Sequence, residues 1–331
     1  MKEQLQHLMS NEKLVNEALH AALGEVNATS SIQKFLEKLG TSLQCDRIYI
    51  FEGKKNCTVN NTFEWCAEGV SAEIDSLQNV PYEAVSWWYD IFDTYNHLVI
   101  EDIEDIKETE PLTYEYLKPQ NIHSLITAPL KIGDEIFGFF GVDNPPEYAI
   151  QNTTYIIEIV AHFLVSLLEK KKLMDKLERI CYEDLLTGVY NRNFLNEYLN
   201  EHSSVENTGI VFCDVLGLKR VNDTLGHQAG DDLLIRASNC LKNTFRKKDI
   251  FRIGGDEFLV ISKNIEEDVF AKRIEELRDK MESYDVKMSL GVVWKPFIND
   301  IEHVIYEADS LMYEEKRAYY ATNDCARGAK E

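Results

Sequence analysis

The stretch FRIGGDEFLV at residues 251–260 sets two glycines and two acids between apolar runs. Apolar runs on both sides of Gly-Gly predict a β-hairpin, because glycine reaches positive φ without a Cβ clash. We therefore expect strands at 251–253 and 258–262, with Asp256 and Glu257 just past the turn. Charge at that position is costly unless it is solvated, paired or bound to a cation.

The length and charge of the chain limit its organisation and partners. A chain of 331 residues is long for a single core and predicts two domains. The formal charge of −22 comes from 57 acids against 35 bases. Such a chain repels polyanions, so we expect no nucleic-acid partner and no membrane partner. A small phosphorylated ligand can still bind through a few local cations or a metal ion.

The seven cysteines are odd in number and scattered, with no Cys/His cluster at zinc spacing. Reduced thiols in a cytosolic protein are the simplest interpretation. The first residues are too polar for a signal peptide, and no apolar run approaches the ~20 residues of a membrane-spanning helix. The sequence therefore predicts a soluble, cytoplasmic protein.

The first half of the chain alternates helical and strand-like stretches. Apolar residues at helical spacing predict an amphipathic N-terminal helix within residues 1–27, and an aromatic-rich helix is expected at 84–92. Gly133-Asp134 predicts a hairpin turn. Strands are expected at 47–52, 58–66, 98–103, 124–130 and 136–142.

This order of elements, with the pieces NTFEWCAEG and APLKIGDEIFGFFGVDN, resembles a GAF domain, a small sensory module. We assign the GAF-like domain to residues 28–154. The resemblance implies an antiparallel sheet flanked by helices and a small-molecule ligand, which the residues do not identify. Four aromatic residues either line the ligand pocket or pack in the core: Trp87, Trp88, Tyr89 and Phe92.

Residues 155–181 contain no glycine or proline and predict a helical linker about 40 Å long. Two apolar sets, separated by the charged EKKK, follow the spacing of a coiled-coil seam. The sets are Ile157, Val160, Leu164 and Leu167, then Met174, Leu177 and Ile180. A second copy of the chain would cover this seam in a homodimer; alternatively, the helix packs on its own first domain.

The second half predicts a compact segment with the succession β, α, β-hairpin, α, β, α, as in split βαβ folds. Strands are expected at 209–215, 249–253, 258–262 and 286–294. Helices are expected at 192–201, 231–245, 266–283 and 301–319.

Acids from two of these strands can converge on one point. GIVFCDV is an apolar strand that ends near Asp214, and the hairpin offers Asp256 and Glu257. If the two strands are neighbours, Asp214 and Asp256 repel each other unless they share a hard cation such as Mg²⁺. Successive strand residues point to opposite faces, which favours Asp256 over Glu257 as the second ligand.

Four strings in this order resemble a GGDEF domain, the diguanylate cyclase family: DLLTGVYNR, CDVLGLKRVNDTLGHQAGDDLL, RIGGDEF and ADSLMYEEK. We assign it to residues 182–331. The resemblance implies a fold like the palm of nucleotidyl cyclases. It also implies condensation of two GTP molecules into cyclic di-GMP with Mg²⁺ or Mn²⁺, two ions per nucleotide site, in a homodimer that a small-molecule effector of the GAF domain controls.

The resemblance also assigns roles to residues. It implies that Asp214, Asp256 and the carbonyl of Val215 bind metal, and that Asp256, with Glu257 beside it, accepts the proton of the attacking 3′-hydroxyl. The substrate contacts that it implies are Lys219, Asn222, His227, Asp231, Gly254, Gly255 and Lys316. Within this set, Asn222 and Asp231 would recognise guanine, because a carboxylate accepts the donor pair that adenine lacks.

The sequence departs from the family pattern ahead of the signature. The feedback site of the family would be Arg246 and Asp249, but only four residues separate Asp249 from Gly254, where five are usual. A spacing that is one residue shorter turns the following side chains of a strand to the opposite face of the sheet. This difference argues against product inhibition through Arg246 and Asp249.

Two alternatives to a diguanylate cyclase stay open. One is a catalytically silent receptor of GTP or a cyclic dinucleotide that signals through protein contacts. The other is a mixed GTP/ATP product, which a small neutral residue in place of Asp231 would have favoured.

Overall fold

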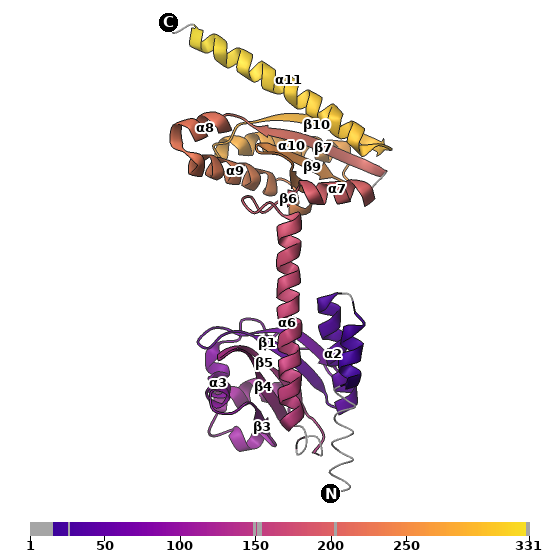
Figure 1. The fold of residues 1–331 in the computed structure, drawn as a ribbon, viewed down its shortest axis with the longest axis vertical. Helices are drawn as coiled ribbons and strands as arrows, with labels where there is room; N and C mark the ends of the chain where they lie inside the picture. Colours follow the sequence, from indigo (N-terminus) through magenta and orange to yellow (C-terminus); the bar gives the residue numbers. More distant parts are fainter. Residues whose placement is uncertain (1–15, 26, 148–149, 151–153, 202–203, 329–331) are drawn as a thin grey trace. The chain divides into compact units, whose positions relative to one another are not determined.

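The computed structural model describes residues 16–25, 27–147, 150, 154–201 and 204–328. The chain divides into two compact units, Met1–Met174 and Asp175–Glu331. Each unit contains a five-stranded sheet with helices packed on it (Figure 1), which confirms the mixed α and β class. Among the described residues, no helix has the length and apolar character needed to cross a bilayer.

The first unit is built on an antiparallel sheet with the strand order β2-β1-β5-β4-β3. Its strands are β1 (Arg47–Glu52), β2 (Asn60–Cys66), β3 (Leu98–Ile100), β4 (Leu125–Ile132) and β5 (Glu135–Asp143). The predicted hairpin turn is confirmed, and Gly133 has a φ of +61° that favours glycine. The strand expected at 98–103 ends early, because Asp102 caps a 3-10 helix over Ile103–Ile106.

Helices cover both faces of this sheet (Figure 1). Alternate residues of β1 face opposite sides. Those on one side pack with α2 (Ala28–Leu43) and α6 (Thr154–Tyr182). Those on the other side, Tyr49 and Phe51, pack with α3 (Ser86–Phe92) and with Leu117 of α4. The remaining elements of this face are α4 (Pro111–Leu117) and the 3-10 helices η1 (Tyr82–Ala84), η2 (Ile103–Ile106) and η3 (Lys118–Gln120).

Residues 16–23 are helical, and the rest of the N-terminal helix expected within residues 1–27 lies mostly outside the described residues. Ala18 and Ala22 belong to the same core as α2. This short stretch therefore packs on its own unit.

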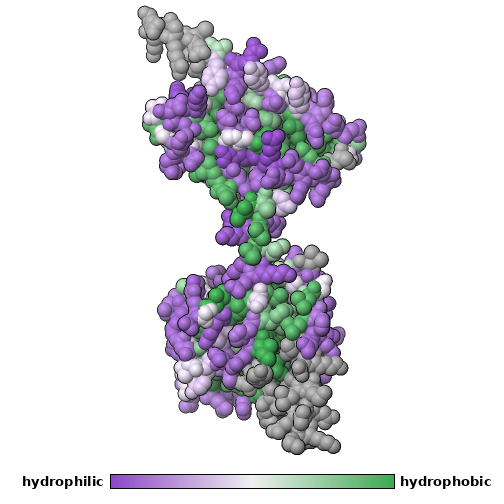
Figure 2. All heavy atoms as spheres, viewed as in Figure 1, coloured by the Kyte–Doolittle hydropathy of each residue, from purple (hydrophilic) through white to green (hydrophobic). Residues whose placement is uncertain are grey.

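The helix α6 has two parts with different surroundings. The first apolar set is buried in the core of the first unit, which consists of Ile157, Val160, Leu164 and Leu167. For this set the alternative of packing on the first domain is the correct one. After the lysines at 170–172 the apolar side chains are between 46% and 58% exposed: Leu173, Met174, Leu177 and Ile180. Figure 2 shows hydrophobic and hydrophilic residues side by side at the surface.

The second unit is built on a sheet with the order β10-β7-β9-β8-β6. Its strands are β6 (Tyr190–Asn191), β7 (Val205–Val215), β8 (Ile250–Arg252), β9 (Glu257–Ser262) and β10 (Met288–Ile298). The pairs are antiparallel except for β6 and β8. Four of these strands follow the predicted apolar runs, whereas β6 is too short to leave a periodic signal.

Helices also cover both faces of the second sheet. Residues of α9 (His227–Lys242) and α10 (Glu267–Ser283) enter one core, and those of α7 (Arg192–Glu201) and α11 (Ile301–Gly328) enter the other. The short helix α8 (Leu218–Leu225) was not predicted. Its sequence LKRVNDTL is mostly polar, and it starts after a glycine that offers no side-chain cap. A 3-10 helix, η4 (Lys247–Asp249), precedes β8.

Candidate functional site

Acids from two neighbouring strands meet at one end of the second sheet. In the antiparallel pair of β7 and β9, Asp214 lies directly opposite Glu257. Opposite residues of such a pair project to the same face. Asp256 precedes β9 in the turn, and its carbonyl accepts a hydrogen bond from the amide of Val215 at 2.9 Å. Strand alternation therefore brings Glu257 to face Asp214 and does not fix the direction of Asp256.

The predicted hairpin forms, but the reason given for its glycines is wrong. Neither Gly254 nor Gly255 has a φ in the left-handed region. A Cβ on Gly254 would instead collide with the carboxylate of Glu257, whereas a Cβ on Gly255 would meet open space. Gly254 thus leaves room for the carboxylate of the Glu257 side chain, which folds over it.

Asp214 is the most buried acid of the site, with 4% of its surface exposed. Burial raises the pKa of its carboxyl, and the charges of Asp256 and Asp309 raise it further. Lys316 on α11 opposes this rise, because its Nζ donates a hydrogen bond to Oδ2 of Asp214 at 2.6 Å. The lysine therefore neutralises part of the local negative charge.

Glu257 belongs to the same electrostatic group. Its pKa is raised by burial first, and then by the charges of Asp256, Asp214 and Asp309. Acids this close repel one another in a partly buried site, which favours a cation among them. Asp309 lies on α11, about 95 residues beyond Asp214 in the chain; it stands in the quoted ADSLMYEEK string, but no role was predicted for it.

The donors of this site suit a hard divalent cation. Carboxylate and carbonyl oxygens are the ligands that Mg²⁺ takes in proteins. Among the described residues, no three His, Cys, Asp or Glu side chains already form a group that can hold a metal ion. An ion that binds to Asp214 therefore has to share its carboxylate with Lys316 or displace that lysine.

The turn between α8 and α9 places the two predicted guanine contacts close together. The side-chain oxygen of Asn222 is buried and has no hydrogen-bond partner. It lies against Gly230, where a Cβ would collide with it, and the half-buried Asp231 is the next residue. His227 begins α9 and is exposed. A buried amide oxygen of this kind is commonly satisfied by an ordered water, an ion or a ligand.

The remaining predicted cations differ in their surroundings. Lys219 is exposed on α8, whereas Lys316 is bound to Asp214. Arg246, in the predicted feedback site, donates from Nε to Oδ2 of Asp249 at 2.9 Å, and Asp249 is buried. These two residues therefore pair with each other.

The signature turn is tied to the segment that follows α6. Nη1 of Arg252 donates to Oδ1 of Asp184 at 2.9 Å, and its Nη2 donates to the carbonyl of Gly255 at 2.6 Å. The same Asp184 oxygen accepts hydrogen bonds from the amide and hydroxyl of Thr187. Arg252 stands in the quoted RIGGDEF string, but only the folded chain shows its partner.

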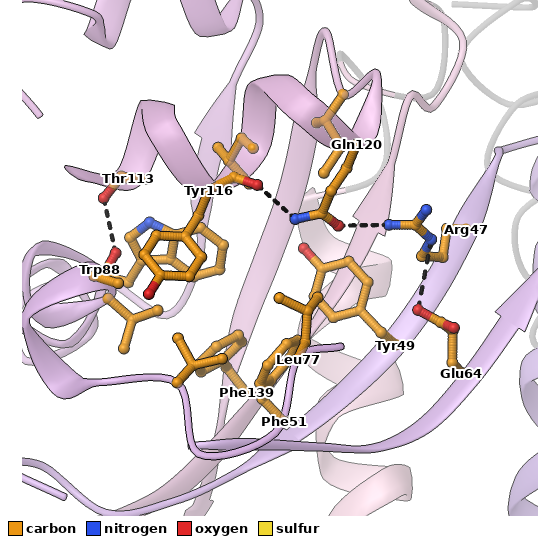
Figure 3. A pocket seen from close by; sticks show the side chains of 15 residues that line it. Arg47, Tyr49, Phe51, Glu64, Leu77, Trp88, Thr113, Tyr116, Gln120 and Phe139 are labelled. Carbon is orange, nitrogen blue, oxygen red and sulfur yellow. Dashed lines mark hydrogen bonds and ion pairs between the residues drawn. The ribbon is translucent and has the colours of Figure 1, made fainter. Parts of the chain in front are cut away.

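The first unit contains a cavity between the sheet and the helices of one face (Figure 3). Trp88 lines this cavity with Phe51 and Phe139. Among the aromatic residues proposed for a pocket, Tyr89 and Phe92 are fully buried in the core and Trp87 packs against it. Tyr89 donates its hydroxyl to the carbonyl of Gly53 at 2.8 Å.

Buried charges lie at one end of this cavity. Arg47 is 2% exposed, and its guanidinium is 3.5 Å from both Glu64 and Asp143. Burial raises the pKa of Asp143 to about 7, although Arg47 lowers it. Asp143 also interacts with the hydroxyl of Tyr49. A single arginine in the strand RIYIFE gives no local sign of these partners.

Two family models match the chain. The model described as "Diguanylate cyclase, GGDEF domain" matches residues 181–320. The GAF domain model matches residues 27–167.

Several curated proteins are similar to parts of the chain. The uncharacterized protein YtrP of Bacillus subtilis is 30% identical over 204 residues, which are 59% of this chain and 35% of that protein. Diguanylate cyclase DosC of Escherichia coli is 31% identical over 150 residues, 40% of this chain and 33% of its own length. Diguanylate cyclase DgcP of Escherichia coli is 30% identical over 185 residues, 49% of this chain and 54% of its own length.

The chain thus spans about a third to a half of the length of these relatives. The two family matches stand in the order that the sequence predicted. The chain therefore contains a GAF domain at residues 27–167, followed by a GGDEF domain at residues 181–320.

Proposed function

We propose that the second unit condenses two GTP molecules into cyclic di-GMP and releases two pyrophosphates. The observation that carries this proposal is the register that sets Asp214 opposite Glu257, with Asp256 beside them in the turn. This arrangement gathers carboxylates at one end of the sheet, and α8 with the guanine contact Asn222 starts shortly after β7 ends.

In this proposal Asp214, Asp256 and the carbonyl of Val215 hold Mg²⁺ or Mn²⁺, with two ions per nucleotide site. When bound, such ions offset charge on the attacking oxygen and on the leaving pyrophosphate. The raised pKa values of Asp214 and Glu257 support the assignment, because burial and the neighbouring acids both disfavour their charged forms, and a bound cation would offset both effects.

The other residues orient the nucleotide and move a proton. Asp256, with Glu257 beside it, accepts the proton from the 3′-hydroxyl of the attacking GTP. Asp231 accepts hydrogen bonds from the N1–H and 2-amino edge of guanine, and the unpartnered oxygen of Asn222 accepts another. The substrate contacts are completed by Lys219, His227, Gly254, Gly255 and Lys316.

We further propose that the enzyme works as a homodimer. Each domain offers one guanine site, so two domains have to meet for two GTP molecules to react. The apolar side chains at 173, 177 and 180 have the 4-3 spacing of a coiled-coil seam and are exposed. A second copy of α6 would bury them and bring the two domains together.

We also propose that a small molecule in the cavity of the GAF domain controls the association of the two GGDEF domains. A ligand shifts an equilibrium between two arrangements only if it binds them with different affinity. The cavity contacts α3 and α4, while α6 packs on the opposite face of the same sheet. The proposed control therefore acts through the sheet.

The pairing of Arg246 with Asp249 supports the view that the feedback site of the family is not used. Cyclic di-GMP would have to compete with Asp249 for Arg246. We infer that product inhibition does not act through these residues.

The proposal is tested by incubating the full chain with an equal mixture of GTP and ATP and with Mg²⁺, followed by mass identification of the products. Cyclic di-GMP is the expected product. Asp256→Asn should reduce its formation by about 10²–10⁴-fold, the contribution typical of a general base. Asp232→Asn, an exposed acid on α9, is the matched control and should retain activity.

The ion pair between Lys316 and Asp214 favours one second candidate, a domain that binds GTP or a cyclic dinucleotide without turnover. In that case the chain binds the nucleotide but forms no product at any protein concentration. A mixed cyclic GMP-AMP product would contradict the guanine specificity assigned to Asp231.

A further inference from the structure

The cavity of the GAF domain is small. Its free volume is about 50 Å³, which corresponds to about three to five water molecules. A cavity that encloses benzene has about 150 Å³, so a single six-membered ring fills this one and extends into its open side. A nucleotide or a tetrapyrrole is several times larger.

The walls of the cavity favour a flat ligand. Phe51 and Phe139 stack with ring centroids 5.1 Å apart, and Trp88 meets Phe139 edge-on at 5.0 Å (Figure 3). Half of the other lining side chains are aliphatic: Leu77, Val80, Ala84, Val85, Leu117 and Ile122. Aromatic rings pack on one another in such geometries with a gain beyond that of apolar burial.

The charges at the end of the cavity are already matched. Nη1 of Arg47 donates to Gln120 at 2.7 Å, its Nη2 donates to the carbonyl of Ser71 at 2.9 Å, and its Nε lies 3.5 Å from Glu64. Arg47 and Glu64 are the charged residues of the lining. An anionic ligand would have to break these contacts in a buried site, which is costly.

Two buried N–H groups of the lining have no hydrogen-bond acceptor among the described residues: Nε of Arg47, which faces the carboxylate of Glu64 at 3.5 Å, and the indole Nε1 of Trp88, which faces no charge. Thr113 donates its hydroxyl to the carbonyl of Ala84, and the amide group of Gln120 is bound at both ends. Trp88 is 4% exposed, and its indole Nε1 meets no acceptor among the described residues. Buried indole N–H groups usually have a partner.

We propose that this cavity binds a small, uncharged, single-ring aromatic molecule whose hydrogen-bond acceptor receives the indole N–H of Trp88. Four features of the cavity indicate this class of ligand. They are its small size, its aromatic walls, the pairing of Arg47 with Glu64, and the indole N–H of Trp88 that has no acceptor. That the ligand also controls cyclase activity rests on the proposed function, whereas its binding does not.

The test uses three probe molecules with the full chain in the absence of GTP, with affinity measured by calorimetry. Acetophenone carries the ring and an acceptor, ethylbenzene carries the ring alone, and benzoate carries a negative charge. Acetophenone is expected to bind about 2–12-fold tighter than ethylbenzene, the ratio that one net hydrogen bond of about 0.5–1.5 kcal/mol gives. Benzoate is expected to bind most weakly.

The variant Trp88→Phe should abolish the preference for acetophenone over ethylbenzene and keep the binding of ethylbenzene. Trp87→Phe is the matched control, since Trp87 does not line the cavity, and it should keep the preference. Should Trp88→Phe fail to fold, the indole ¹H–¹⁵N resonance of Trp88 in the wild type serves instead. It should move downfield with acetophenone and not with ethylbenzene.

Tightest binding of benzoate, binding of none of the three probes, or a preference that survives Trp88→Phe would overturn the inference. The outcome is separate from that of the product assay. A chain that binds acetophenone but makes no cyclic di-GMP refutes the proposed enzyme alone. A chain that makes cyclic di-GMP but binds no probe refutes the ligand class alone.

Discussion

Asp214 and Glu257 lie directly opposite each other on β7 and β9, at the end of the sheet where the signature turn approaches. Like charges in that position destabilise a pair of strands. Lys316 offsets part of the repulsion, and the pKa values of both acids are still raised. The repulsion between these two acids therefore lowers the stability of the fold, and a bound divalent ion would reverse that loss. Such an arrangement is expected of a metal-binding site and not of a hydrophobic core.

Gly254→Ala should destabilise the second unit, and Gly255→Ala should not. A Cβ at 254 forces the carboxylate at the flexible end of the Glu257 side chain into another rotamer, which costs about 0.5–1.5 kcal/mol. A Cβ at 255 meets open space. Urea unfolding of both variants without nucleotide measures the difference. Equal free energies of unfolding for the two variants would show that Glu257 does not need the space over Gly254.

Asp231→Asn should weaken GTP binding by about 10–100-fold, because hydrogen bonds to a charged group contribute about 1.5–3 kcal/mol. Asp232→Asn, the neighbouring exposed acid, should leave the affinity unchanged. Equilibrium binding of a non-reactive GTP analogue gives both values. The assignment fails if the two variants bind the analogue equally well.

The fold, and the positions of Asp214, Asp256 and Glu257 at strand ends, follow from the sequence because they depend on local signals. Apolar runs and the turn at 254–255 predicted β8, β9 and their hairpin, and the apolar strand ending near Asp214 predicted its neighbour. The contribution of Asp309, the ion pair of Lys316 and the partner of Arg252 depend on contacts between distant segments. No periodicity or turn chemistry encodes such contacts.

Sequence also does not decide between two structural explanations of the same residue pattern. Glycine at 254 fits a positive φ and also fits a close approach, and only the folded chain distinguishes the two. The apolar spacing of α6 fits a seam between two copies and also fits burial in its own domain. In the structure the first apolar set of α6 is buried and the second is exposed, with the charged stretch at 170–172 between them.

Stability of the first unit should depend on pH through Asp143. Burial raises its pKa in the folded chain to about 7, above the value of about 4 for an unfolded chain. The contribution of Asp143 is therefore complete below about pH 4 and is lost as the pH rises through about 7. Asp143→Asn should remove this part of the pH dependence, so that its Tm relative to wild type rises between pH 4 and pH 8.

The control for this prediction is Asp134→Asn, which changes an exposed acid in the turn between β4 and β5. Its Tm relative to wild type should stay constant over the same range, as measured by circular dichroism. A constant difference for Asp143→Asn as well would mean that Arg47 keeps the carboxylate charged and holds its pKa low.

Leu177→Gln should weaken self-association of the full chain. Leu177 is 46% exposed, and burial of a leucine side chain in an interface contributes about 1.5–3 kcal/mol. The dissociation constant of the dimer should rise by at least about tenfold in sedimentation experiments. Glu178→Gln introduces the same residue one position along α6 and should have little effect. Equal self-association of both variants would place the dimer contact elsewhere.

The most direct test of the central claim is the affinity for Mn²⁺, measured by electron paramagnetic resonance in the presence of a non-reactive GTP analogue. If acids from two strands hold the ion together, Asp214→Asn and Asp256→Asn should each weaken Mn²⁺ binding strongly, and Asp232→Asn should not. Wild-type affinity in either of the first two variants would contradict the shared metal site and the chemistry proposed for it.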